Sequence, residues 1–70
     1  MPNPADHIRL LFGLKLHQLR LDRGLSASEL ATRAGLAVSY ISEIEKGRKY
    51  PKTDKIAALA QALDVEYDQL

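Results

Sequence analysis

Cysteine and tryptophan are absent from the 70 residues of this chain, which contains one phenylalanine and three tyrosines. Without cysteine, neither a disulfide nor a zinc site with thiolate ligands can form. His7 and His17 stand far apart in the sequence with no further histidine beside them, so we expect no metal site. The motifs of serine hydrolases, phosphate-binding loops and zinc proteases are missing as well. We therefore expect a protein that is not an enzyme and that has no cofactor.

Long apolar runs are also missing. No stretch approaches the roughly 20 apolar residues of a membrane-spanning helix, and the first residues lack the basic and then apolar pattern of a secretion signal. A hydrophobic content of 46% nevertheless argues against disorder. A chain of this size forms one domain with a small core, burying only about 60% of the surface that its unfolded form exposes. We expect a soluble protein of the cytoplasm with no membrane partner.

The net charge of the chain is only +1, but charges of one sign are concentrated in the sequence. A basic stretch over residues 46–55 holds a single acidic residue, Asp54, whereas the last residues are acidic. A basic stretch is often just a solvated loop, but a basic surface is also what binds the phosphates of nucleic acids. The basic residues are Lys46, Arg48, Lys49, Lys52 and Lys55, and the acidic ones are Asp64, Glu66 and Asp68.

Residues 26–34 carry the signals of a short helix. Ser26 and Glu29 have the spacing of a capping box, in which each side chain accepts a hydrogen bond from the other residue's backbone N–H. Gly35 can adopt the left-handed conformation in which such a helix ends. The apolar face of this helix consists of Leu30, Ala31 and Ala34.

A second short helix is predicted over residues 38–46, directly after this turn. Ile41 and Ile44 form its apolar stripe, with Tyr40 partly alongside, and Gly47 ends it. Helices this short are unstable alone in water, so both must pack on the rest of the chain. Two short helices joined by a tight turn are typical of a helix-turn-helix, which presents its second helix to the major groove of DNA.

The rest of the chain is predicted to support this pair. Residues 1–5, with two prolines, are expected to be a flexible arm, and residues 6–70 a single domain. A long helix is expected over residues 6–23, a fourth helix from 52 or 53 to about 63, and a short fifth turn over 66–70. The sequence thus predicts an all-α, compact bundle of about five short helices. Its core should contain Phe12, Leu16, Leu19, Leu30, Ile41, Ile44, Leu59 and Leu63, with Ile8 near it.

Several motifs stand in a fixed order along the chain: Leu25-Ser-Ala-Ser-Glu-Leu-Ala31, Ala34-Gly-Leu36, Tyr40-Ile-Ser-Glu-Ile-Glu-Lys-Gly47 and Pro51. They are preceded by Phe12-Gly13 and Leu16-His-Gln-Leu-Arg20, and followed by Ile56-Ala-Ala-Leu-Ala-Gln-Ala-Leu-Asp-Val65. In this register the chain resembles the Cro/repressor-type helix-turn-helix family, also called XRE-like, over about 60 residues without a gap.

This resemblance implies a lambda-repressor-like fold and a function in transcription. It implies sequence-specific binding of double-stranded DNA by a bacterial-type regulator, a repressor by expectation, or by the DNA-binding domain of a longer one. Such proteins act as homodimers, formed on the DNA or through a region beyond this chain. We expect such a protein to be associated with the nucleoid.

In this family the second motif helix enters the major groove with its N-terminus first. Its chemistry here is sparse, because the helix lacks the arginine, glutamine and asparagine that make the commonest base contacts. Specificity would then depend on DNA shape or on a dimer. In other readings the serines only cap the helix, and Glu43 is solvated or pairs with a lysine. By resemblance, the base-contacting residues are Val38, Ser39, Tyr40, Ser42 and Glu43.

The resemblance also places phosphate contacts and a structural ion pair. The position after Ser26 is often a phosphate-binding glutamine in the family, but it is Ala27 here, which puts this anchor in doubt. Arg20 and Glu45 match a buried pair between the first and third helices of related domains; the alternative is two exposed charges. The expected phosphate-contacting residues are Ser26, Lys46, Arg48, Lys49, Tyr50 and Lys52.

Leu10, Leu14 and Leu21 fall together on a face of the first helix nearly opposite its core face, at about 100° per residue. The N-terminal arm or the fifth helix could fold over these leucines. Alternatively, they form an interface, either with a second copy or with a missing part of a longer protein.

A different class of function is a protein-interaction module, such as an antitoxin, that uses the same fold. The acidic Glu43 and the lack of basic residues on the outer face of the second helix are compatible with it. Binding to DNA that weakens with salt would separate the two readings.

Overall fold

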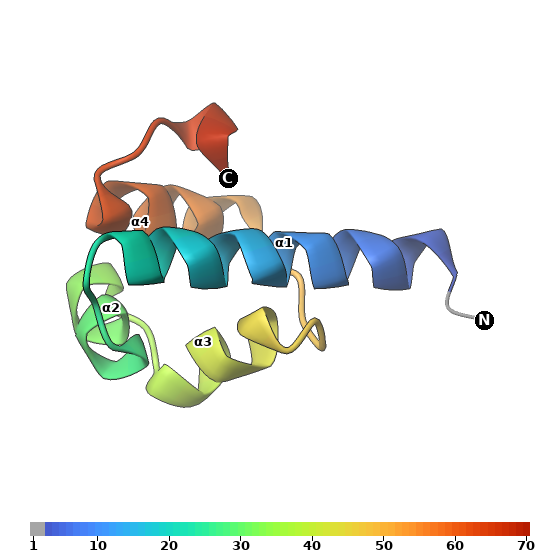
Figure 1. Cartoon of the computed structure of the whole chain (residues 1–70), viewed down its shortest axis with the longest axis horizontal. Coiled ribbons are helices and arrows are strands. Elements are labelled where there is room, and N and C mark those ends of the chain that lie inside the picture. The colour runs from blue at the N-terminus through green and yellow to red at the C-terminus, as the bar shows by residue number, and fades with distance from the viewer. Residues whose placement is uncertain (1–2) are drawn as a thin grey trace.

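A computed structural model describes residues 3–70 of the chain (Figure 1). This part of the chain contains helices and no strand, so the expected all-α class is confirmed. The expected count of about five helices was slightly too high, because the last element is a single 3-10 turn. Asp64 ends the fourth helix in a left-handed conformation. The elements are α1 (Pro4–Asp22), α2 (Ala27–Ala34), α3 (Val38–Glu45), α4 (Thr53–Leu63) and η1 (Tyr67–Gln69).

α1 begins inside the segment that the sequence analysis assigned to a flexible arm. Asn3 caps the helix: its side-chain oxygen accepts a hydrogen bond from Asp6 N at 3.0 Å, and its N–H donates to the Asp6 carboxylate at 3.2 Å. Pro4 occupies the first helical position, where its fixed backbone angle and missing N–H are favourable. The proline that suggested an arm therefore starts the helix. Residues 1 and 2 of the expected arm lie outside the described residues.

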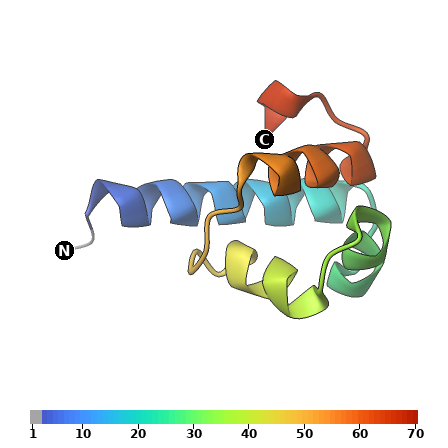
Figure 2. The same ribbon diagram turned by 180° about the vertical axis from the view of Figure 1, so that it is seen from behind.

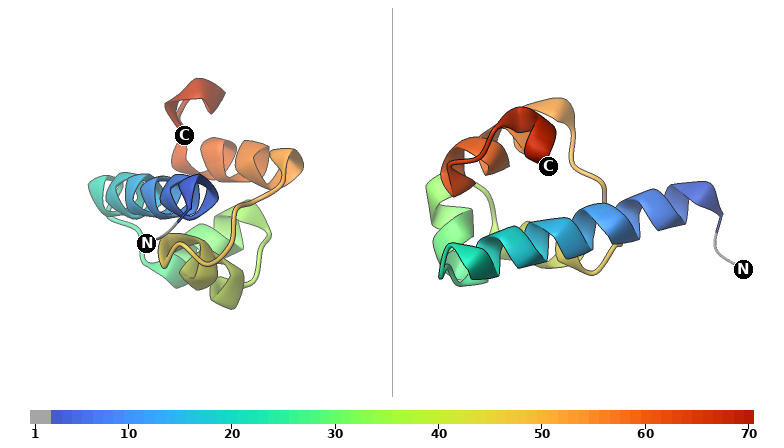
Figure 3. Two further views of the ribbon diagram at one scale, coloured as in Figure 1. Left: turned by 90° about the vertical axis from the view of Figure 1, so that its right-hand side faces the viewer. Right: turned by 45° about the horizontal axis from the view of Figure 1, so that its top comes forward.

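The helices enclose a small apolar core. Viewed from the end, α1 lies on one side, α4 on the other and α3 below, with α2 closing the far end (Figure 3). Seen from behind, α4 lies in front of α1 (Figure 2). Most of the expected core residues are buried, but Leu19 is half-buried and Ile8 is exposed, because the first turns of α1 extend beyond the other helices. The buried apolar side chains of the central cluster are Phe12, Leu16, Leu25, Leu30, Ala31, Ile41, Ile44, Leu59 and Leu63.

α1 and α3 approach each other at Gly13 without any side chain between them. A Cβ atom added to Gly13 would lie 2.8 Å from the carbonyl oxygen of Glu45 and closer still to that of Ile44. Glycine is needed here because of this backbone contact, not for its own backbone conformation, which is helical. The contact fixes the distance of α3 from the longest helix of the domain.

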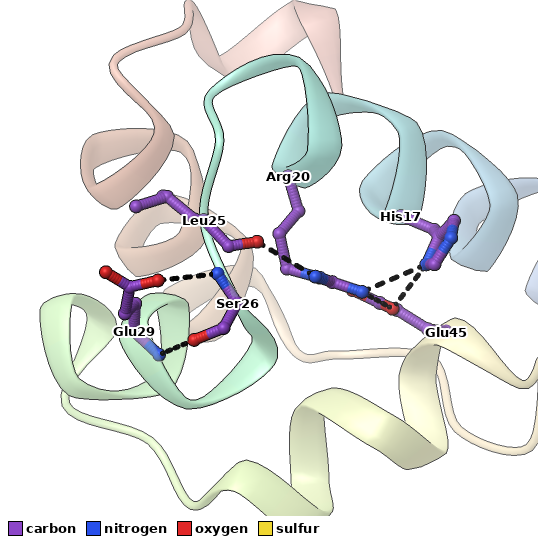
Figure 4. Close-up of polar contacts among 6 residues, drawn as sticks. All are labelled: His17, Arg20, Leu25, Ser26, Glu29 and Glu45. Atoms are coloured by element: carbon purple, nitrogen blue, oxygen red, sulfur yellow. Dashed lines mark hydrogen bonds and ion pairs between the residues drawn. The ribbon is translucent and has the colours of Figure 1, made fainter.

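The orientation of α3 is fixed by an ion pair about two turns further along α1, in the same contact between the two helices. Arg20 Nε lies 2.8 Å from Glu45 Oε2 and Arg20 Nη2 lies 2.9 Å from Glu45 Oε1 (Figure 4). Arg20 also donates to the backbone oxygen of Leu25 at 2.9 Å, which links α1 to the start of the helix-turn-helix. Each of the paired side chains is 11% exposed. The two residues that the resemblance paired are therefore in contact, with bidentate geometry.

The charged state of this pair is favoured by its surroundings. Burial pushes the pKa of Glu45 upward, but the hydrogen bonds from Arg20 and His17 outweigh it and the net pKa is lowered. The same bond to Glu45 raises the pKa of Arg20 against the opposing effect of burial. Both groups are charged at neutral pH.

Substituting Gly13 tests the close approach of α1 and α3. In an unobstructed helix, Gly→Ala stabilises by about 1 kcal/mol. Here the added methyl group meets backbone carbonyls that cannot rotate away, so we expect Gly13→Ala to destabilise the domain by about 2 kcal/mol. Chemical denaturation measures the difference. A variant as stable as the natural chain would show that the two backbones are not in contact.

Substituting either member of the ion pair tests its role in the fold. We expect Arg20→Met or Glu45→Gln to lower the free energy of unfolding by about 3–5 kcal/mol, since one buried charge is left without its partner. The pKa of Glu45 is lowered by folding, so its contribution is complete above its unfolded pKa of about 4.3 and is lost as the pH falls through the folded value. The gap between the natural chain and Glu45→Gln in urea denaturation should therefore shrink below about pH 4. A gap that is small at pH 7 would contradict the buried pair.

Candidate nucleic-acid interface

α2 and α3 form a helix-turn-helix. A capping box holds the start of α2, and a backbone hydrogen bond holds the turn after it. The hydroxyl of Ser26 accepts from Glu29 N at 3.0 Å, and Ser26 N donates to the Glu29 carboxylate at 2.9 Å, so the expected capping box is present (Figure 4). These bonds from Ser26 hold the pKa of Glu29 below its ordinary value. Gly35 ends α2 with φ +69°, and Leu36 N donates to the Ala31 oxygen at 2.9 Å. The turn therefore delivers the chain directly into α3.

The outward face of α3 is open to solvent at its N-terminal end. Val38 and Ser39 are exposed, and Ser42 and Glu43 are half-buried further along. Tyr40 differs from the other expected base-contacting residues. It packs against the core, and Lys49 Nζ lies 5.7 Å from the centre of its ring. Its side chain therefore lies beside the loop after α3, where it lines a groove with Arg48 and Lys49.

A groove of about 730 Å³ runs along one side of α3, between the turn before the helix and the loop after it. We call it the basic groove, after the five basic side chains that line it. Three of the expected phosphate-contacting basic residues meet here, and Tyr50 lines the groove as well. Arg9 reaches it from α1, and no pattern in the sequence indicated that this residue lies near the loop. The five basic residues are Arg9, Arg48, Lys49, Lys52 and Lys55.

Three of the basic side chains have acidic partners near the surface. Arg48 Nη1 lies 3.6 Å from Glu43 Oε2, and Lys55 Nζ lies 3.8 Å from Asp54 Oδ2. Arg9 pairs with Asp6 on its own helix. Ion pairs at an exposed surface contribute about 0–1 kcal/mol and are readily exchanged, so a phosphate can replace these partners.

The loop that carries Arg48, Lys49 and Lys52 is anchored to the core. Pro51 is fully buried, and the ring of Tyr50 meets the ring of Phe12 edge-on, with 5.0 Å between the centres. A backbone anchored in this way holds its charged side chains in one place at a small cost in conformational entropy.

The other two expected phosphate-contacting residues lie elsewhere. Lys46 is exposed at the end of α3 on the side away from the basic groove. Ser26 is exposed at the start of α2, and its hydroxyl accepts a bond from Glu29 but can still donate one.

The leucine face of α1 is uncovered among the described residues. Leu14 is 63% exposed and Leu21 is 51% exposed, and Leu11, beside them, is 66% exposed. Leu10 is 43% exposed and packs on the turn at Gly47, where an added Cβ would lie 3.0 Å from its Cγ. η1 does not fold over these leucines, because it packs on α4. The expected cover by a fifth helix is therefore not found.

Comparisons with known proteins identify the family of this chain. The model of the helix-turn-helix family matches residues 16–70. Control protein C.BamHI of Bacillus amyloliquefaciens is 40% identical over 63 residues, which cover 89% of this chain and 78% of that protein. The transcriptional repressor RghR of Bacillus subtilis is 42% identical over 60 residues, which cover 84% of this chain but only 44% of RghR. The chain thus spans most of one relative and less than half of the other.

A solved structure agrees with the fold. The crystal structure of the restriction-modification controller protein C.AhdI from Aeromonas hydrophila has a TM-score of 0.88 at 36% identity, covering 90% of this chain and 96% of that one. The chain therefore belongs to the helix-turn-helix family of DNA-binding transcriptional regulators, and the resemblance to Cro/repressor-type regulators is confirmed. Among residues 3–70, no helix has the length and apolar character needed to cross a membrane.

Proposed function

We propose that this protein binds double-stranded DNA with α3 in the major groove and regulates transcription from that site. The observation that carries the proposal is the basic groove beside the open face of α3. An α-helix fits the major groove, whose edges are lined by the phosphates of the two strands. In this orientation Val38, Ser39 and Glu43 face base edges, while Arg48, Lys49 and Lys52 follow the phosphates of one strand.

The side chains on the outward face of α3 predict which DNA bases the protein recognises. Val38 suits a thymine methyl group, Ser39 can donate or accept, and Glu43 can accept from the amino group of cytosine. Glu43 must first leave Arg48, which would then be free to bind a phosphate. Readout by so few groups is weak, so sequence-dependent DNA shape and a second copy of the chain would add to the specificity.

We propose that the second copy of the chain binds through the leucine face of α1. Leu11, Leu14, Gln18 and Leu21 follow one another at steps of three and four residues, the spacing of a seam between two packed helices. Leu14 borders α3, because it lines a groove with Ser42 and Lys46, whereas Leu11 and Leu21 do not line that groove. Two copies joined through Leu11 and Leu21 would leave the exposed N-terminal end of α3 free. A two-fold pair of this kind matches an operator with two inverted half-sites.

Two groups of variants test the assignment to DNA. Against a duplex recovered by selection from random sequences, we expect Arg48→Ala and Lys49→Ala each to weaken binding to every sequence and to lower the salt slope by about one. Val38→Ala and Glu43→Gln should instead change which sequences are recovered, because these side chains face bases. Fluorescence anisotropy at several salt concentrations measures the first effect, and repeated selection measures the second.

Lys15→Ala is the matched control, because Lys15 is an exposed basic residue outside the basic groove. Equal losses of affinity for Lys15→Ala and Arg48→Ala would contradict the assigned surface. If the natural chain binds no duplex even at low salt, the antitoxin or protein-interaction alternative is favoured.

Charged residues on the leucine face test the dimer. We expect Leu11→Glu with Leu21→Glu to leave the helical circular dichroism unchanged, since both side chains are exposed, and to convert dimers into monomers in analytical ultracentrifugation with duplex DNA. Tyr67→Glu, at an exposed apolar residue of η1, is the control and should remain dimeric. A double variant that still dimerises would place the interface elsewhere.

A further inference from the structure

A second groove lies on the opposite side of α3 from the basic groove. It has a volume of about 440 Å³ and is bounded by α1, by the first residue of α2 and by the second half of α3. We call it the histidine groove, because His17 of α1 lines it with an imidazole that is 47% exposed. The rest of its lining comes from Leu14 and Arg20 of α1, Ala27 of α2, Ser42 and Glu45 of α3, and Lys46 directly after α3.

The positions of the two grooves match the two strands that border a major groove. A helix in the major groove has a phosphate backbone on each side, and the groove is about 12 Å wide. The basic groove serves one backbone and is lined by five basic residues. The histidine groove faces the other backbone, where the basic residue directly after α3 is Lys46 and the glutamine position of the family is occupied by Ala27. His17 is placed to supply the missing contact.

The hydrogen bond between His17 and Glu45 determines which nitrogen is available. His17 Nδ1 lies 2.8 Å from Glu45 Oε1 (Figure 4). A carboxylate only accepts hydrogen bonds, so Nδ1 must carry a hydrogen. Arg20 Nη2 lies 3.1 Å from the same nitrogen, but a guanidinium only donates, so this contact is not a hydrogen bond when Nδ1 donates to Glu45 at the shorter distance. The second ring nitrogen, Nε2, has no partner among residues 3–70.

The charge of the ring then decides its interaction with a phosphate. In the neutral ring with a hydrogen on Nδ1, Nε2 carries a lone pair, which repels a phosphate oxygen. In the protonated ring, Nε2 donates a hydrogen bond and adds a positive charge, which makes a strong contact with phosphate. Imidazoles ordinarily change charge at about pH 6.5, close to physiological pH.

We infer that His17, oriented by Glu45, binds a backbone phosphate of the second DNA strand in its protonated form, so that DNA binding takes up a proton. The inference rests on the proposed function and adds a pH dependence to it. The charged groups that face His17 are Arg20 on its own helix, Glu45 on α3 and Lys46 directly after α3; α2 contributes Ala27, which has no charge. Arg20 donates to Glu45, so the protonated ring of His17 and the ammonium of Lys46 are the cationic groups of this groove that can donate to a phosphate.

The test is the affinity for DNA as a function of pH. The probe is a mixed-sequence duplex of about two helical turns, measured by anisotropy between pH 5.5 and 8.5 at constant ionic strength. For the natural chain we expect Kd to rise about tenfold as the pH rises through the range in which imidazoles lose their proton. His17→Gln should bind at every pH about as weakly as the natural chain binds at pH 8, and His17→Arg about as tightly as it binds at pH 6.

The only other histidine provides the matched control. His7→Gln should keep the full pH dependence, because His7 lines neither groove. Melting temperatures of all variants at pH 6 and pH 8 separate a change of affinity from a change of stability.

Three results would overturn the inference. The first is a Kd of the natural chain that does not change with pH, and the second is a pH dependence that survives in His17→Gln. In both cases salt-sensitive binding still supports the proposed function. The third is the absence of DNA binding by every variant at every pH, which overturns the proposed function and this inference with it.

Discussion

The contact between α1 and α3 is the constraint on which the rest of this structure depends. α3 has eight residues, too few to be stable on its own, and neither its first residue nor the residue before it supplies a side-chain cap. Its position is set by the backbone contact at Gly13 and by the bidentate pair of Arg20 and Glu45. These two contacts fix distance and orientation separately, since the first is steric and the second is directional. A helix that reads DNA needs both to be fixed, because an error of about 1 Å misplaces the hydrogen bonds by which bases are told apart.

α3 combines an apolar stripe that packs in the core with a polar outer surface. Ile41 and Ile44 are completely buried, whereas Val38 and Ser39 are exposed and Ser42 and Glu43 are half-buried. The loop that follows is attached to the core through Pro51 and the pair of Tyr50 and Phe12. On one side of α3, charged side chains therefore extend from the anchored loop after this helix. On its other side, they extend from α1 and α3, which pack against each other.

The sequence predicted the elements whose signals are local. The capping box of Ser26 and Glu29, the left-handed glycine after α2 and the apolar stripe of α3 each lie within a few residues, so their meaning does not depend on the rest of the fold. The start of α1 was missed because proline signals both a loop and a first helical turn, and the capping role of Asn3 decides between them. Ile8 was expected near the core because helical periodicity gives the direction of a side chain but not where the neighbouring helices end.

The candidate site, too, has some features that local sequence signals predict and others that depend on tertiary packing. The basic loop could be read from the sequence, but the arrival of Arg9 in the basic groove depends on how α1 crosses the loop. The partner of His17 is 28 positions away in the chain, so the choice of its free nitrogen could not be predicted from its neighbours. Such contacts depend on tertiary packing, which no local pattern encodes.

Glu45 connects the stability of the domain to its proposed binding of DNA. One carboxylate pairs with Arg20, which holds α3 on α1, and also orients the imidazole of His17. The two effects belong to different ranges of pH. The lowered pKa of Glu45 keeps its carboxylate charged well below neutral pH, whereas imidazoles ordinarily titrate at about pH 6.5. The carboxylate that orients the ring, and the helix that this carboxylate holds, therefore stay in place over the pH range of the proposed binding test.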